Sequence, residues 1–137
     1  MTALFADTFY WIALADFTDR AHEQALSVTA ERAASAIVTT DEVLAEYLNF
    51  FSRTPEARRR AVESARAILS NPAIRVIPQS RGSFLAGLDL YAQRSDKDYS
   101  LTDCISMQTM RREGLTEVLT GDRHFEQEGF RALFRDS

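Results

Sequence analysis

The sequence predicts an α/β fold of three layers (α/β/α) around a mainly parallel central sheet of about five short strands. Short apolar runs, such as Leu4-Phe5-Ala6 and Ile74-Arg75-Val76-Ile77, alternate with longer segments of helical periodicity. The connections between these runs are too long for hairpins. Successive strands are therefore expected to lie parallel, with crossover helices on both faces of the sheet.

The first third of the chain predicts two strands and the helices that connect them. The expected elements are a strand at 4–6, a buried helix at 8–14, a turn at 16–19, an amphipathic helix at about 20–32 and a strand at 35–38. Thr39 and Glu42 fit a capping box at the start of the next helix. Val43, Tyr47 and Phe50 give that helix an apolar face.

The remaining segments continue the alternation. The expected elements are a helix from 55 to about 69, a strand at 74–77, a helix at about 80–94, a polar turn at 95–98, a helix from 100 to about 113, a strand at 117–120 and a last strand near 132–134. Pro55 suits a first helical turn, and Ser100 suits an N-cap. Asn71-Pro72 interrupts the chain between a helix and a strand.

Length and composition predict a single domain over residues 1–137. A hydrophobic fraction of 45% with 26% charged residues is ordinary for a globular protein. No apolar stretch is long enough to span a bilayer, and the N-terminus resembles no signal peptide, so no membrane partner is expected. Cys104 is the only cysteine, which agrees with a reducing compartment and a cytoplasmic location.

Four carboxylates are expected to meet at one edge of the sheet. Asp7 and Asp122 directly follow strands, and Asp103 lies in the first turn of a helix that begins at the same edge. Glu46 lies in the second turn of a helix that leaves this edge, among apolar residues. Because ligands of open parallel sheets bind outside the carboxyl ends of the strands, this edge is the expected site.

Crowded carboxylates repel one another, by about 4 kcal/mol per pair at about 4 Å and an effective dielectric near 20. Either raised pKa values or a divalent cation must offset this repulsion. Oxygen ligands without Cys or His favour Mg²⁺ or Mn²⁺, as one or two ions, over Zn²⁺. Such ions can activate water for attack on a phosphodiester.

Each acid also has a purely structural explanation. Asp7 could cap the following helix, Glu46 could pair with an arginine, Asp103 could complement a helix dipole, and Asp122 could be a turn residue. The net charge of −4 argues against a nucleic-acid partner until its distribution is considered. The other 16 acids match the 16 Lys and Arg, so the four nominated acids account for the whole excess.

Arginines supply 15 of the 16 basic residues, which suits bidentate phosphate recognition. A GC-rich genome would produce the same ratio. The RNA-binding candidates are Arg58, Arg59, Arg60 and Arg123. The alternative is a solvated helix face with ion pairs such as Glu56 with Arg60.

Other reaction classes fit less well. A phosphoacceptor domain would need a lysine after a late strand, whereas the only lysine, Lys97, lies in a turn. His22 and His124 are the only histidines, and no Gly-x-Ser-x-Gly motif is present. His124 is therefore expected at the surface or beside the site.

The ordered set of motifs resembles the PIN-domain ribonucleases, and within them the VapC-type toxins of type II toxin–antitoxin systems. The matching segments are Asp7-Thr8, residues 39–46, Ser100-Leu101-Thr102-Asp103 and residues 119–125. The resemblance implies a compact PIN-like domain and Mg²⁺- or Mn²⁺-dependent cleavage of RNA.

The resemblance also assigns roles to residues and partners. It implies that Asp7, Glu46, Asp103 and Asp122 are the catalytic, metal-binding cluster, with Thr8 and Thr120 as polar neighbours of the metal. It further implies an RNA substrate, a cognate antitoxin that covers the site, and a homodimer. A PIN endonuclease outside a toxin pair and a catalytically inactive interaction domain of the same fold remain alternatives.

Overall fold

The computed structural model describes residues 3–135 and contains a five-stranded sheet in the order β3-β2-β1-β4-β5. The strands are β1 (Leu4–Ala6), β2 (Ile37–Thr40), β3 (Ile74–Ile77), β4 (Glu117–Leu119) and β5 (Arg131–Ala132). All neighbouring strands pair in parallel, which confirms the predicted fold class.

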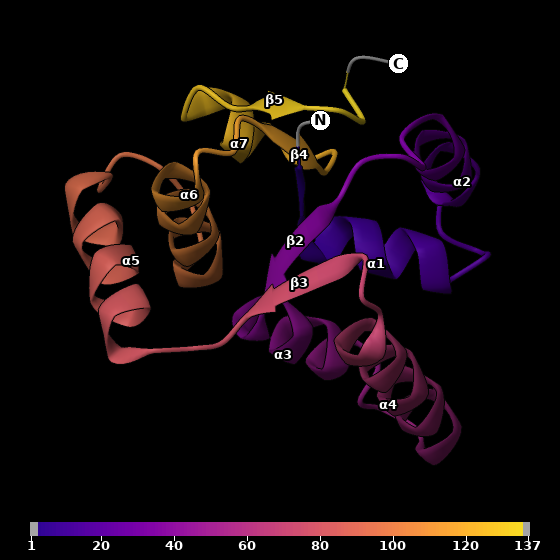
Figure 1. Ribbon diagram of the computed structural model, residues 1–137. Helices are drawn as coiled ribbons and strands as arrows, with labels where there is room; N and C mark the ends of the chain where they lie inside the picture. Colours follow the sequence, from indigo (N-terminus) through magenta and orange to yellow (C-terminus); the bar gives the residue numbers. More distant parts are fainter. Residues whose placement is uncertain (1–2, 136–137) are drawn as a thin grey trace.

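Seven helices connect the strands within the described residues. They are α1 (Thr8–Ala15), α2 (His22–Glu31), α3 (Asp41–Phe50), α4 (Pro55–Ser70), α5 (Arg81–Gln93), α6 (Leu101–Glu113) and α7 (Arg123–Gln127). Figure 1 shows α1 and α6 on opposite sides of the sheet, with α5 beyond α6 and with α3 at the carboxyl end of β2. No helix among residues 3–135 is both long enough and apolar enough to cross a membrane.

The strand order reverses direction at β1. The first two crossovers step from β1 to β2 and from β2 to β3, whereas the next crossover returns to the other side of β1 and adds β4. Parallel crossovers are right-handed, so the two crossovers before the reversal lie on one face of the sheet, and the crossover with α5 and α6 lies on the other. The carboxyl ends of β1 and β4 therefore flank the switch point where α/β folds bind ligands.

The capping box predicted for Thr39 and Glu42 is wrong. β2 extends to Thr40, two residues beyond the predicted end, and Thr40 is the N-cap whose hydroxyl accepts from the amide of Val43. Thr39 is fully buried instead, and its hydroxyl donates to the carbonyl of Ala6 in β1.

Helix boundaries elsewhere follow the predicted signals closely. Thr54 caps α4 with Pro55 in the first turn, and Ser80 caps α5. α6 begins with a full capping box between Ser100 and Asp103 and ends at Gly114, whose φ of 71° is left-handed. β5 covers 131–132 rather than 132–134, although the amides of residues 133 and 134 still donate to carbonyls in and after β4.

Helices α5 and α6 pack closely because Gly87 gives α5 a surface without a side chain. A Cβ at Gly87 would overlap Cγ1 of Ile105 and would lie 3.1 Å from the Ile105 backbone. This contact sets the distance between the two helices and hence the position of the α6 N-terminus.

We expect Gly87→Ala to lower the free energy of unfolding by about 1–3 kcal/mol, because overpacking would force the two helices apart. The matched control is Gly82→Ala in the same helix, where an added Cβ meets only the Ser80 hydroxyl at 3.9 Å. That change should stabilise the protein by up to about 1 kcal/mol through helix propensity. Urea denaturation of both variants measures the difference, and equal effects would contradict the close packing.

Candidate active site

The pairing of β1 with β4 determines the position of Asp7. Ala6 and Leu119 are partners in this ladder, so Asp7 and Thr120 emerge side by side. The Thr120 hydroxyl donates to Oδ2 of Asp7 over 2.8 Å, and both residues are buried. Asp7 occupies the N-cap position of α1, but its side chain makes no capping hydrogen bond, so the capping explanation fails.

Asp103 combines a structural contact with a position facing the site. Its Oδ2 accepts from the amide of Ser100 over 3.1 Å, and its amide donates to the Ser100 hydroxyl. Asp103 is only 8% exposed. Its Oδ1 accepts no hydrogen bond from any residue in the described range, which leaves that oxygen available to a ligand.

Asp122 is the N-cap of the short helix α7, where its Oδ1 accepts from the amide of His124 over 2.9 Å. The loop before it is tight because Gly121 lies against Phe9. A Cβ at Gly121 would lie 2.7 Å from Cζ of that ring. The small residue thus lets Asp122 approach the carboxyl end of β1.

One cleft of about 560 Å³ contains all four predicted acids, Asp7, Glu46, Asp103 and Asp122. Thr8 also lines this cleft, whereas Thr120 lies behind Asp7 and holds it. Glu46 projects from the second turn of α3, is partly exposed, and forms no ion pair with any residue between 3 and 135. The structure therefore brings together residues that are up to 115 positions apart in the sequence.

Charge crowding is strongest at Asp7. Burial raises the pKa of its carboxyl to about 7, and the negative charges of Asp103 and Glu46 add to this shift. The hydrogen bonds from Thr120 and from the Thr8 backbone oppose it. Burial also raises the pKa of Asp103, and the nearby charge of Asp122 acts in the same direction. Without a compensating positive charge, these ionised carboxylates therefore destabilise the folded protein at neutral pH.

His124 belongs to this site, beside Asp103 and Asp122. Its Nδ1 lies 3.1 Å from Oδ2 of Asp103 and 3.2 Å from Oδ1 of Asp122, while Nε2 lies 2.8 Å from Oδ1 of Asp98. Burial opposes a charged ring, but the carboxylates of Asp122, Asp103 and Asp98 raise the pKa of His124 overall.

A network of ion pairs around Glu128 holds Tyr99, whose ring packs on His124. Glu128 accepts from Arg94, Arg111 and the Tyr99 hydroxyl, and its side chain is 4% exposed. The Tyr99 ring packs on the His124 ring with centroids 5.3 Å apart. Glu128 therefore ties the loop before α6 to the segment after α7, and no sequence pattern pointed to this network.

The arginines predicted to bind RNA lie outside the cleft. In α4, Arg59 pairs with Glu56 and Glu63, and Arg60 pairs with Glu56 at 3.1 Å, as the ion-pair alternative predicted. Arg58 donates to the carbonyl of Ser52. Arg123 is exposed at the start of α7, next to Asp122.

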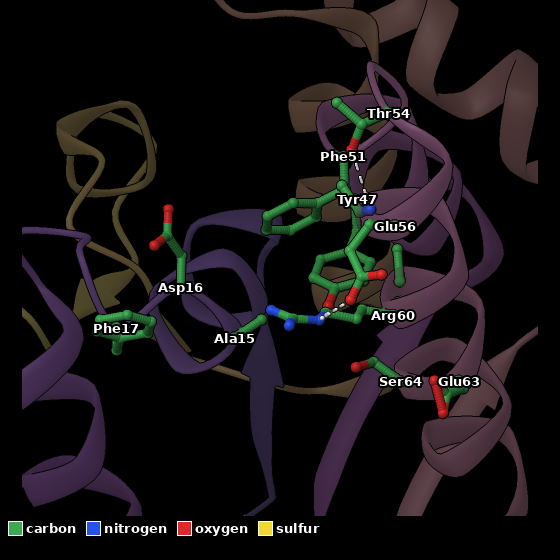
Figure 2. Close-up of a pocket in the computed structure, with 12 residues that line it drawn as sticks. Ala15, Asp16, Phe17, Tyr47, Phe51, Thr54, Glu56, Arg60, Glu63 and Ser64 are labelled. Atoms are coloured by element: carbon green, nitrogen blue, oxygen red, sulfur yellow. Dashed lines mark hydrogen bonds and ion pairs between the residues drawn. The ribbon is translucent and has the colours of Figure 1, made fainter.

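A second groove, also of about 560 Å³, lies between the end of α1 and the helices α3 and α4. Figure 2 shows Asp16 and Phe17 on one side of it and Tyr47, Phe51 and Arg60 on the other. Phe17 is 79% exposed. This groove contains none of the four acids.

The residues of the acidic cleft fit a small cation. One carboxylate oxygen each from Asp103 and Asp122 and one ring nitrogen of His124 lie within 4.8 Å of one another. The Thr8 hydroxyl, buried beside them, has no hydrogen-bond partner among the described residues. Asp7 and Glu46 face the same space with further oxygens.

Several known proteins are similar to this chain in sequence and in fold. The 23S rRNA-specific endonuclease VapC20 of Mycobacterium tuberculosis is 26% identical over 127 residues, which cover 93% of this chain and 95% of the relative. The crystal structure of that protein, described as a sarcin-ricin loop cleaving toxin, superposes with a TM-score of 0.85 at 25% identity, over 93% of this chain and 96% of the other.

Two more distant structures share the fold alone. FitAcB from Neisseria gonorrhoeae superposes with a TM-score of 0.67 at 16% identity, over 94% of each chain. The DNA-bound VapBC from Salmonella typhimurium superposes with a TM-score of 0.66 at 15% identity, over 96% of this chain and 97% of the other. The PIN domain family model matches residues 4–130, and the chain therefore belongs to the PIN-domain family.

Proposed function

We propose that this protein is a divalent-metal-dependent endoribonuclease and the toxin of a toxin–antitoxin pair. The observation that carries the proposal is the meeting of Asp7, Glu46, Asp103 and Asp122 in one cleft at the switch point of the sheet. Similarity to VapC20 over nearly the whole chain supports the reaction class. We further propose that the chain forms a single domain and works in the cytoplasm.

In this proposal Asp7, Asp103 and Asp122 hold one or two Mg²⁺ or Mn²⁺ ions, and Glu46 either holds an ion or orients the attacking water. A bound divalent cation supplies positive charge that lowers the pKa of water and neutralises the phosphate. Thr120 fixes the Asp7 carboxylate through its hydrogen bond. Thr8 lies beside the reacting groups.

The reaction is hydrolysis of a phosphodiester in single-stranded or loop RNA. The water oxygen bonds to phosphorus, the bond to the 3′ oxygen breaks, and that oxygen takes a proton. The products carry 5′-phosphate and 3′-hydroxyl ends. Because VapC20 is named for 23S rRNA, this RNA is the first substrate to test. Arg123, which is exposed next to Asp122, is the candidate phosphate contact.

A cognate antitoxin would cover the cleft. The groove of Figure 2 supports this because it is open, adjoins the same helix α3 that carries Glu46, and exposes Phe17. A small protein encoded beside this chain and co-purifying with it would be the expected partner.

We also propose a homodimer through α5. The helix exposes a stripe with helical spacing, made of Phe84, Leu85, Leu88 and Tyr91. Arg81 begins this helix, where its charge opposes the helix dipole. In an antiparallel pair of α5 helices, Arg81 would instead lie near the negative C-terminal end of the partner helix.

Asp103→Asn should reduce RNA cleavage by at least about a hundredfold, the loss typical of removing a group that stabilises transition-state charge. The assay follows 23S rRNA by mapping of 5′ ends, with Mg²⁺ or Mn²⁺ present. Asp96→Asn is the matched control, because Asp96 is exposed on the turn before α6. Cleavage by Asp103→Asn at the wild-type rate would contradict the proposed function.

Without metal, Asp7→Asn should be more stable than the wild type, and increasingly so as the pH rises. The folded protein holds the Asp7 proton up to a pKa of about 7, whereas the unfolded chain releases it near 3.8. The wild type therefore loses free energy of unfolding between about pH 4 and pH 7, in total up to about 4 kcal/mol, and this loss is absent from the variant.

Urea denaturation in EDTA from pH 5 to pH 8 measures this difference. His124 and Asp103 titrate in both proteins, so the difference between the two curves reports the Asp7 carboxyl together with its coupling to the Asp103 charge. A difference that stays constant over this range would show that Asp7 is not protonated in the metal-free site.

Leu88→Glu should convert the dimer into a monomer, since it would place a charge in the centre of the apolar stripe. Leu26→Glu is the matched control, because Leu26 is an equally exposed leucine on α2. Light scattering during gel filtration measures the mass of each protein. A wild type that is monomeric at micromolar concentration would overturn the dimer proposal.

A further inference from the structure

The orientation of His124 is not explained by the four acids alone. Nε2 faces Asp98, which is 83% exposed and whose ionised carboxylate can only accept a hydrogen bond. Nε2 therefore carries a hydrogen. Nδ1, on the other side of the ring, faces oxygens of Asp103 and Asp122, which in their ionised forms are also acceptors.

A lone pair on Nδ1 would point at two carboxylate oxygens unless something positive lies between them. A second proton on the ring would satisfy this requirement, and so would a cation. The Nδ1 distances of 3.1 and 3.2 Å match the spacing of neighbouring ligands on an octahedron, about 3 Å for metal–ligand distances of about 2.1 Å.

The contact with Asp98 is typical of a metal-binding histidine. Histidines that bind metals generally donate their other ring N–H to a carboxylate or carbonyl, which fixes the tautomer and the ring orientation. Tyr99 packs on the ring and is itself held by Glu128, so His124 is fixed from two sides.

Thr8 provides an independent indication that a ligand belongs here. Its side chain lines the same cleft, it is only 6% exposed, and its hydroxyl has no partner among the described residues. A buried hydroxyl without a partner costs about 1–3 kcal/mol. An ion with its coordinated waters, or a substrate phosphate, would satisfy this hydroxyl.

We propose that Nδ1 of His124 is a direct ligand of a divalent cation that Asp103 and Asp122 also bind, and that Asp98 is the positioning residue that orients the ring. The inference rests on the proposed function, because Asp103 and Asp122 line the acidic cleft and Nδ1 of His124 lies within 3.2 Å of both. It adds a nitrogen ligand to a site otherwise made of oxygens. Mg²⁺ takes oxygen ligands, whereas the affinity of divalent transition metals for nitrogen ligands rises from Mn²⁺ to Cu²⁺, so His124 should favour Mn²⁺ over Mg²⁺.

Electron spin echo envelope modulation of the Mn²⁺-loaded protein tests the ligand directly, because it detects a coordinated ¹⁴N nucleus. We expect nitrogen coupling in the wild type and its loss in His124→Phe, which keeps a ring against Tyr99. Calorimetry should show that the Kd for Mn²⁺ rises at least about tenfold in this variant. The Kd for Mg²⁺ should change less.

Two further variants complete the experiment. His22→Phe is the matched control, because His22 bonds to the carbonyl of Ala13 outside the cleft and should leave the coupling unchanged. Asp98→Asn alters an exposed residue and does not endanger the fold. It should keep the nitrogen coupling but raise the Kd for Mn²⁺ about tenfold.

The outcomes separate this inference from the proposed function. Mn²⁺ binding without nitrogen coupling, or equal or tighter binding by His124→Phe, would overturn the histidine ligand and leave the acidic site intact. Absence of Mn²⁺ and Mg²⁺ binding by the wild type would overturn the metal site itself. If His124→Phe does not fold, the coupling in the wild type and the affinity of Asp98→Asn still decide the question.

Discussion

The burial of the Asp7 carboxylate at the switch point of the sheet is the constraint on which the site depends. Asp7 directly follows Ala6, which pairs with Leu119, and it is only 4% exposed and lies against Thr120. Asp103 and Glu46 then add negative charge from helices on two sides. The chain could avoid this cost by neutral side chains at the same positions, so the retained charges point to a ligand that compensates them.

The structural and functional explanations of the acids are not exclusive. Asp103 completes the capping box of α6, and Asp122 caps α7, so each carboxylate also stabilises a helix start. Those capping contacts fix the rotamer of a side chain that faces the cleft. A carboxylate held by backbone amides needs no rearrangement before it meets a cation, and this reduces the cost of binding.

The order of strands and helices could be predicted from the sequence because apolar runs and cap residues are local signals. β3 and the start of α6 match the prediction, and membership of the PIN-domain family is confirmed. The Thr39-Thr40 pair was misassigned because either hydroxyl can cap a helix, and only the pairing of β2 with β1 buries Thr39. The contacts of His124 with Asp98 and Asp103 could not be predicted, because they join segments separated by more than 20 residues.

The acids of the cleft come from different crossover connections of the sheet, so cation binding and folding would be coupled. Glu46 comes from α3, in the crossover from β2 to β3, and Asp103 comes from α6, in the crossover that returns to β4. These two helices contact each other. A cation bound by Glu46 of α3 and Asp103 of α6 would therefore connect two crossovers that no strand pairing connects directly. Binding energy at the site would then become folding energy for the whole sheet edge, as expected where a metal site does not exist in the unfolded chain.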